Sequence, residues 1–275
     1  MAGLLFGTAG TPKSTEIKST AGGIERAAEL GLGCMEIEFV RGVYLDEESA
    51  REVAETASAN NITLSVHAPF YINLNAREPE KVRASRERIL QSARTGAVCG
   101  ARSVVVHTAF YLGDPPDEAY PKIKQRLKEI LDRLQQEGIA VTVRPEVMGK
   151  GTQFGTVEEV IRLCSELVGT APCIDFAHCH AATGAFNTYP EFVSILEQIE
   201  AGLGRAALDD MHIHASGIRY GKKGEQKHLN LKESDFNYRD LLSALKDFEV
   251  NGLLVCESPN LEEDALLMQR YYHHL

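Results

Sequence analysis

Short runs of apolar residues alternate with amphipathic stretches along the whole chain. Eight of these runs have the length and the β-branched content of buried strands. They lie at residues 4–9, 34–39, 62–67, 103–107, 140–146, 172–176, 210–214 and 253–258. Most of them lack the polar alternation of a sheet that is half exposed to water, as expected when both faces are buried. The pattern therefore predicts parallel strands enclosed by helices.

Helix signals lie between the strand candidates. The apolar residues of 116–137 recur at helical spacing, and Gly138 suits the left-handed position that ends many helices. Thr156 and Glu159 have the spacing of a capping box at the start of another helix. Pro79 suits the first turn of a third helix. Strands and helices thus alternate from one end of the sequence to the other.

Eight β/α units in 275 residues predict the fold. We expect a single (β/α)8 TIM barrel, one α/β domain spanning residues 1–275. An open doubly wound sheet is the alternative, but no GxGxxG motif follows the first strand. Residues 215–234 form the longest stretch without periodicity and are expected to be a functional loop. In such barrels the active site lies at the C-terminal ends of the strands.

Composition and charge indicate in which compartment the chain works and which partners it can bind. Apolar residues make up 44% of the sequence and charged residues 25%, and no apolar run approaches the length of a membrane helix. The six cysteines show no CxxC spacing and are expected to be reduced thiols. We therefore expect a cytoplasmic monomer with no membrane attachment and no protein partner. The net charge of -10 argues against bulk attraction to nucleic acid, although residues 219–228 are distinctly basic.

Histidines and carboxylates gather at the ends of the strand candidates. Seven of the nine histidines lie there: His67, His107, His178, His180, His212, His214 and His228. Three carboxylates close similar runs: Glu146, Asp175 and Glu257. A single histidine near a strand end usually packs or caps, but several groups converging from different strands indicate a shared metal centre. Zinc accepts this mixture of imidazole and carboxylate ligands.

Seven short motifs follow one another at these positions. They are HAPFYINL (67–74), VVVH (104–107), PEVMGKGTQFG (145–155), CIDFAH (173–178), MHIH (211–214), KHLNL (227–231) and CESPN (256–260). In order and spacing they resemble the endonuclease IV group of abasic-site endonucleases, and the resemblance covers essentially the whole chain. It implies a TIM barrel that holds three zinc ions and cleaves DNA on the 5′ side of an abasic site.

Carried over residue by residue, the resemblance assigns the metal ligands. The first metal would be held by His67, His107 and Glu146. The second would be held by Glu146, Asp175, His212 and Glu257, with Glu146 bridging the two. The third would be held by His178 and His228. Glu146 and Glu257, the carboxylates best suited to bridge cations, are the predicted catalytic residues.

The third site departs from the family pattern. Gln226 stands where the family has an aspartate, so Glu225 or His214 would have to replace that ligand, or the site would be weak or empty. His180 is a further candidate, as a ligand or as a residue that orients one. We therefore expect two to three zinc ions per chain, with manganese as the alternative ion.

Two groups of residues are candidates for contact with DNA. Phe70 and Tyr71 occupy the positions where the family inserts side chains at the lesion, although loop packing would explain them equally well. Lys222, Lys223 and Lys227 could bind backbone phosphates or form an ordinary solvated loop. The predicted partner is DNA that contains abasic sites.

Two other functions remain open beside a zinc-dependent DNA phosphodiesterase. A sugar isomerase or epimerase of the xylose isomerase-like barrels would need one divalent metal, and Glu146, Asp175, His212 and Glu257 supply that set. Such an enzyme has no need of four more histidines, and this surplus favours the nuclease. A non-catalytic DNA-damage or nucleotide-binding protein that lost the third metal is the other alternative.

Overall fold

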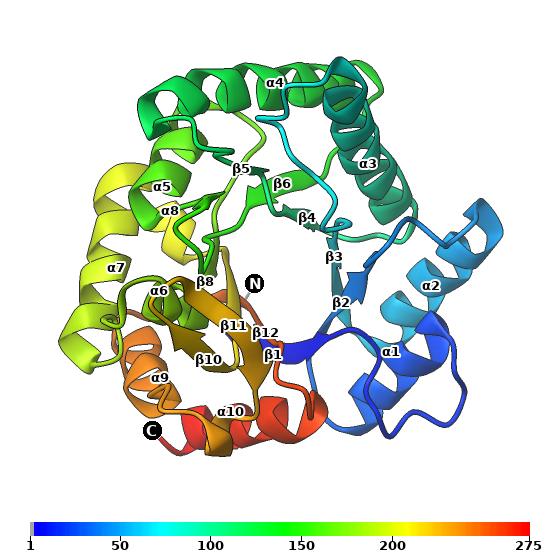
Figure 1. The fold of residues 1–275 in the computed structure, drawn as a ribbon. Helices are drawn as coiled ribbons and strands as arrows, with labels where there is room; N and C mark the ends of the chain where they lie inside the picture. The colour runs from blue at the N-terminus through cyan, green and yellow to red at the C-terminus, as the bar shows by residue number, and fades with distance from the viewer. Residues whose placement is uncertain (1–2) are drawn as a thin grey trace.

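Eight parallel strands form the centre of the computed structural model, which describes residues 3–275 (Figure 1). In chain order they are β1 (Leu4–Ala9), β2 (Cys34–Glu38), β3 (Thr63–His67), β4 (Ser103–Val106), β6 (Thr142–Pro145), β8 (Cys173–Asp175), β9 (Met211–Ala215) and β12 (Gly252–Cys256). Their order in the sheet is β6, β4, β3, β2, β1, β12, β9, β8. Parallel bridges from Val143 to Thr170 and from Glu146 to Cys173 close the ring. The predicted TIM barrel is confirmed, and each predicted strand overlaps one barrel strand.

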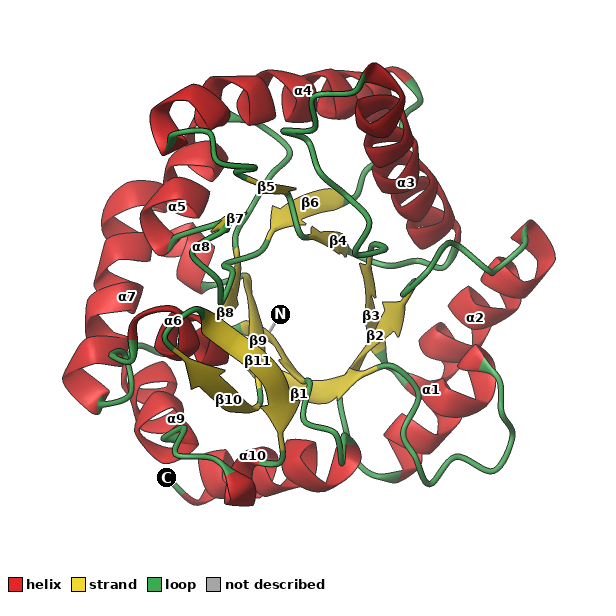
Figure 2. Cartoon of the chain, in the orientation of Figure 1, coloured by secondary structure: helices red, strands yellow, loops and turns green. Residues whose placement is uncertain are grey.

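Helices surround this barrel (Figure 2). They are α1 (Thr20–Glu29), α2 (Glu47–Asn60), α3 (Pro79–Val98), α4 (Pro116–Gln136), α5 (Val157–Glu166), α6 (Phe176–Thr183), α7 (Tyr189–Leu203), α8 (Arg205–Leu208), α9 (Tyr238–Asp247) and α10 (Glu262–His274). Three predicted end signals are confirmed. Helix α3 begins at Pro79, Thr156 and Glu159 form the capping box of α5, and Gly138 follows α4 with φ +70°.

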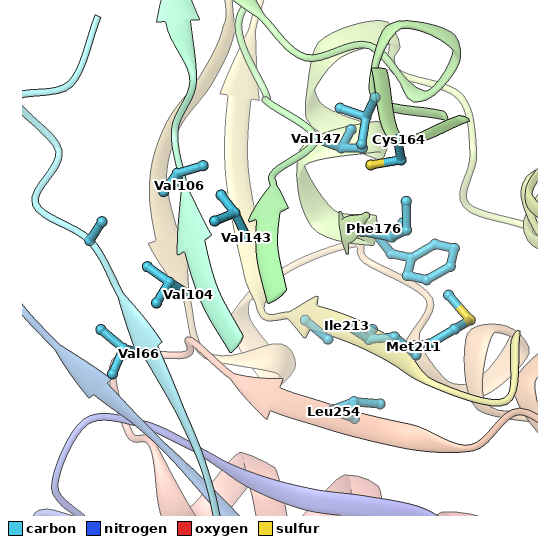
Figure 3. Close-up of a cluster of buried hydrophobic side chains, with 14 of the residues drawn as sticks. Val66, Val104, Val106, Val143, Val147, Cys164, Phe176, Met211, Ile213 and Leu254 are labelled. Atoms are coloured by element: carbon cyan, nitrogen blue, oxygen red, sulfur yellow. The ribbon is translucent and has the colours of Figure 1, made fainter. Parts of the chain in front are cut away.

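Strand side chains alternate between an outer hydrophobic core and the barrel interior. On β9, Met211 and Ile213 pack into the outer core with residues from neighbouring strands and helices (Figure 3). His212 and His214, one residue along from each, instead reach Glu36 of β2 inside the barrel. This period of two is what a strand imposes. It places every second residue of a barrel strand where it can meet residues from other strands.

The segment at 215–234 differs from the loop that its lack of periodicity predicts. It forms an antiparallel hairpin and a short 3₁₀ turn: β10 (Gly217–Gly221), β11 (Gly224–Leu229) and η1 (Leu231–Glu233). A second small antiparallel pair is made by β5 (Ala109–Phe110) and β7 (Gln153–Phe154). The hairpin carries no clear alternation because its register shifts between Arg219 and Tyr220 and much of it is exposed. Among residues 3–275, no helix has the length and apolar content needed to cross a membrane.

Candidate metal centre

Three strand ends bring the first group of predicted ligands together. His67 ends β3, while His107 and Glu146 directly follow β4 and β6. Glu146 Oε2 lies 3.1 Å from His67 Nε2 and 2.9 Å from His107 Nε2. The other ring nitrogen of His67 lies 2.8 Å from the carbonyl oxygen of Ala68, which fixes the orientation of the ring. One ligand atom from each of the three residues falls within 4.8 Å of the others, a spacing that fits one cation.

A second group shares Glu146 with the first. It consists of Glu146, Asp175, His214 and Glu257, whose ligand atoms also lie within 4.8 Å of one another. Several of these atoms are buried and have no hydrogen-bond partner within the described chain: Glu146 Oε1, Asp175 Oδ2, His214 Nδ1 and Glu257 Oε2. Buried polar atoms are rarely left without partners. These atoms therefore fit a cation that they would bind together.

The histidine in this second group is His214, whereas the sequence assigned His212. His214 Nδ1 lies 3.5 Å from Glu146 Oε1 and 3.5 Å from Glu257 Oε1. His212 lies opposite Cys173 in the β8–β9 register, two residues before the level of Asp175, so its ring is too deep to join this group. Burial lowers the pKa of His212 to about 4. The correction follows from register, because both histidines point inward and only their height in the barrel separates them.

The third group is built by a helix start and the hairpin. Asp175 caps α6, and its Oδ1 accepts a 2.7 Å hydrogen bond from the backbone N–H of His178. His228, on β11, brings its Nε2 to 3.4 Å from His178 Nε2. Asp175, His178 and His228 form a donor group within 4.8 Å. Glu225 Oε2 lies 3.6 Å from His178 Nε2, so Glu225 borders this group in the way expected of a substitute for the missing aspartate.

The hairpin reaches the third group only because two glycines let it approach the loop after β6. A Cβ on Gly224 would lie 2.1 Å from the carbonyl oxygen of Gly149, and Gly224 has φ +89°. We predict that Gly224→Ala displaces the hairpin, lowers the bound metal by about one ion per chain and costs about 1–3 kcal/mol of stability. Elemental analysis and thermal unfolding measure both effects. Gly221→Ala is the matched control, since its Cβ would meet only the flexible end of Gln226. Equal effects from both variants would contradict this account.

The three groups concentrate charge in a buried space. Burial raises the pKa of Asp175 well above its ordinary value. Burial also opposes the charged forms of His67 and His178, but nearby carboxylates outweigh it and raise the pKa of each to about 10. The carboxylates therefore attract positive charge strongly enough to hold protons on buried imidazoles. Divalent cations would supply the same charge compensation.

Two glutamates of β2 in the barrel interior were missed by the sequence reasoning. Glu36 contacts both His212 and His214, at 3.0 and 2.9 Å. Glu38 has a buried Oε1 without a hydrogen-bond partner, and burial raises its pKa to about 8. The signal was present in the segment CMEIEF, because acids two residues apart in an otherwise apolar strand must share a face.

The remaining candidates lie outside the three groups. Phe70 and Tyr71 are 43% and 59% exposed, and the Phe70 ring stacks on His107 with centroids 6.5 Å apart. The three lysines are exposed on the hairpin: Lys222, Lys223 and Lys227. His180 faces away from the metal groups, with Nδ1 2.8 Å from the carbonyl of Ala185 and its ring against Tyr220. Its contacts hold α6 against the hairpin. Arg144, which lies two residues before Glu146, pairs with Asp210 at 2.7 Å.

Known proteins resemble this chain in sequence and in fold. An uncharacterized protein of Methanocaldococcus jannaschii is 48% identical over 99% of this chain and 98% of its own length. A probable endonuclease 4 of Staphylococcus epidermidis is 24% identical over 80% of this chain and 74% of its own length. Endonuclease IV from Thermus thermophilus superposes with a TM-score of 0.73 at 21% identity, covering 97% of this chain and 98% of that one. A D-tagatose 3-epimerase-like protein gives 0.74 at 21% identity, covering 97% and 96%.

The two structural matches have nearly equal scores, so they show the fold and do not separate nuclease from epimerase. The resemblance to the endonuclease IV group, expected from the motifs, is confirmed by the sequence relatives and by the Thermus structure. The family model described as xylose isomerase-like TIM barrel matches residues 24–271. The chain therefore belongs to the xylose isomerase-like TIM barrel family.

Proposed function

We propose that this protein is a zinc-dependent phosphodiesterase that cleaves DNA at abasic sites. One observation carries the proposal: three donor groups adjoin one another at one end of the barrel. Glu146 belongs to the first and second groups, and Asp175 belongs to the second and third. A single-metal enzyme would need only the second. The three groups together resemble the three-zinc arrangement of the endonuclease IV group.

The donor chemistry identifies which residues would hold the cations. The first metal would take His67, His107 and Glu146, and the second would take Glu146, Asp175, His214 and Glu257. The third would take His178, His228 and either Asp175 or Glu225. Bound zinc would supply Lewis-acid chemistry, which polarises a phosphoryl oxygen and lowers the pKa of coordinated water. Glu146 would act as a catalytic residue by binding the first two cations together, and Glu257 by holding the second.

Exposed side chains beside these groups suit contact with DNA. Phe70 already stacks on His107 and leaves much of its own ring in solvent, so a base could stack on it or the ring could enter the space of a missing base. Arg88 binds the backbone carbonyl of Tyr71 at 3.0 Å, which steadies this loop. The hairpin lysines lie on β11, which carries His228, and in the turn before it, and we infer that they bind backbone phosphates. These local features would allow DNA to bind although the net charge of the protein is -10.

Phe70→Ala should weaken binding of abasic DNA and leave metal content unchanged. Loss of stacking on one aromatic ring costs about 1–3 kcal/mol, which corresponds to a rise in Kd or KM of roughly 5- to 150-fold. Steady-state cleavage and equilibrium binding of a labelled abasic duplex measure the effect. Val168→Ala is the control, because Val168 is an exposed apolar residue in the turn before β8, at the opposite end of that strand from the metal groups. If Phe70→Ala bound the abasic duplex as tightly as the wild type, Phe70 would not be part of the DNA interface.

The function is tested by incubating the zinc-loaded protein with a duplex that carries one abasic site and with the same duplex without it. We expect a single cut on the 5′ side of the lesion and no cut in the intact duplex. Cleavage should stop when zinc is removed and return when it is restored. Absence of cleavage by protein with full zinc content would overturn the proposal and favour a protein that only binds damaged DNA.

A ketose epimerase is the second candidate, because the second donor group alone makes a complete single-metal site. Glu146 and Glu257 would then move protons at a carbon next to a carbonyl group. An assay for epimerisation of unphosphorylated ketohexoses with manganese separates the two functions. Turnover of a sugar with one bound metal would favour the epimerase, and the donors of the first and third groups would then need another role.

We also infer that residues 1–275 form one functional domain of a cytoplasmic protein. The first and last barrel strands, β1 and β12, pair over five positions, so neither end of the chain can leave without opening the barrel. All six cysteines are free and buried. Free thiols are expected in a reducing compartment.

A further inference from the structure

A fourth group of metal-type donors lies deeper in the barrel than the three described above. Its sulfur and imidazole members are Cys173, His212 and His214, whose ligand atoms lie within 4.8 Å of one another. Glu36 of β2 lies beside the two histidines from across the barrel interior. All four residues are at most 1% exposed. The group therefore has no contact with solvent.

The donor atoms of this group converge without bonding one another. Glu36 Oε2 lies 3.0 Å from His212 Nε2, and Glu36 Oε1 lies 2.9 Å from His214 Nε2. Both Nε2 atoms and Glu36 Oε1 nevertheless have no hydrogen-bond partner of good geometry within the described chain. Buried polar atoms are rarely left without partners. A cation held by the imidazoles would be balanced by the Glu36 carboxylate.

Neighbouring hydroxyl groups orient two of the donors. Ser103 Oγ lies 3.4 Å from His212 Nδ1, which leaves Nε2 to face the group. Ser65 Oγ donates a 2.8 Å hydrogen bond to Glu36 Oε2, which leaves Oε1 free. Both serines are buried. Outer partners that fix the far side of a histidine or carboxylate are a regular feature of metal sites.

Cys173 differs from the other cysteines in its surroundings. The other five belong to hydrophobic clusters, where buried cysteine packs as a small apolar residue: Cys34, Cys99, Cys164, Cys179 and Cys256. Cys173 belongs to neither cluster and lies opposite His212 in the β8–β9 register.

We propose that the barrel interior binds one further zinc-type divalent cation through three buried side chains, Cys173, His212 and His214, with the Glu36 carboxylate beside the two imidazoles. Thiolate and imidazole are the ligands found in structural zinc sites. His214 borders two sites, since its Nδ1 faces Glu146 and Glu257 while its Nε2 faces Glu36. When both sites are occupied, His214 would bind one cation through each nitrogen as an imidazolate, with release of its N–H proton. This inference does not depend on phosphodiesterase activity.

Cobalt substitution tests the deep site separately from the other three. The other groups offer only nitrogen and oxygen, so a near-ultraviolet thiolate-to-cobalt charge-transfer band reports Cys173 alone. The full-length protein is stripped with chelator and titrated with Co²⁺, and bound metal is counted by elemental analysis. We expect the band in the wild type and in Cys164→Ala, with its complete loss and about one fewer ion per chain in Cys173→Ala. His212→Gln, which touches only the deep group, should weaken or shift the band.

Two results would contradict the deep site. If cobalt bound the wild type without a sulfur band, metal would occupy only the nitrogen and oxygen groups. The phosphodiesterase proposal would not be affected by this result. A band that persists in Cys173→Ala would assign it to another cysteine. If Cys173→Ala does not fold by circular dichroism, the wild-type spectrum and the His212→Gln variant still decide the question.

Discussion

Glu146→Gln should abolish cleavage of abasic DNA and remove metal from two groups at once. One carboxylate serves both, with Oε2 at 2.9–3.1 Å from His107 and His67 and Oε1 at 3.5 Å from His214. A glutamine keeps the shape of the side chain but lacks the charge and turns one oxygen into an N–H₂ donor. Loss of a residue that merely orients a metal ligand costs roughly 10- to 100-fold in activity or affinity. A ligand shared by two cations should therefore cost more than about 100-fold in kcat/KM.

Elemental analysis and kinetics of the purified variant measure both effects, and circular dichroism checks that it is folded. Glu197→Gln, an exposed residue of α7, is the isosteric control and should match the wild type in activity and metal content. Near-normal activity in Glu146→Gln would show that the two groups do not share a bridging ligand. Lost activity with unchanged metal content would show that Glu146 takes part in the reaction but does not bridge two cations.

The fold and most of the site follow from patterns that are local in the sequence. Each barrel strand is an apolar run with both faces buried, and the helix ends carry residues such as Pro79 and Gly138 that act over one turn. The candidate ligands could be brought together from sequence because a parallel barrel gathers the C-terminal ends of its strands at one edge. A histidine or carboxylate that ends an apolar run can therefore be assigned to this edge of the barrel before any tertiary contact is known.

The parts that could not be predicted depend on relations between strands. His212 and His214 point the same way, and only the β8–β9 register decides which of them is level with Asp175. The alternation in CMEIEF could have indicated that Glu36 points inward, but not that it meets these histidines, which lie across the barrel and more than 170 residues away in sequence. The hairpin that presents His228 depends on the close approach of Gly224 to Gly149. None of these relations leaves a periodic signal in the sequence.

Removing divalent ions should destabilise the protein as well as inactivate it. Each cation that binds the folded chain at 100 times its Kd contributes about 2.7 kcal/mol, so loss of two such ions should cost about 5 kcal/mol. For a chain of this size that corresponds to a fall in Tm of roughly 10–20 °C. The metal-free chain should still fold, because His67 and His178, each with a pKa raised to about 10, can hold protons that offset the carboxylates.

Thermal unfolding before chelation, after chelation and after return of zinc measures this stabilisation. The Glu146→Gln variant serves as the internal comparison. It already lacks the shared carboxylate, so chelator should lower its Tm by much less than it lowers that of the wild type. A wild-type Tm that is unchanged after metal removal, verified by elemental analysis, would mean that the buried donors are satisfied without cations. The unpartnered oxygens of Glu146, Asp175 and Glu257 would then have to be paired by protons or water.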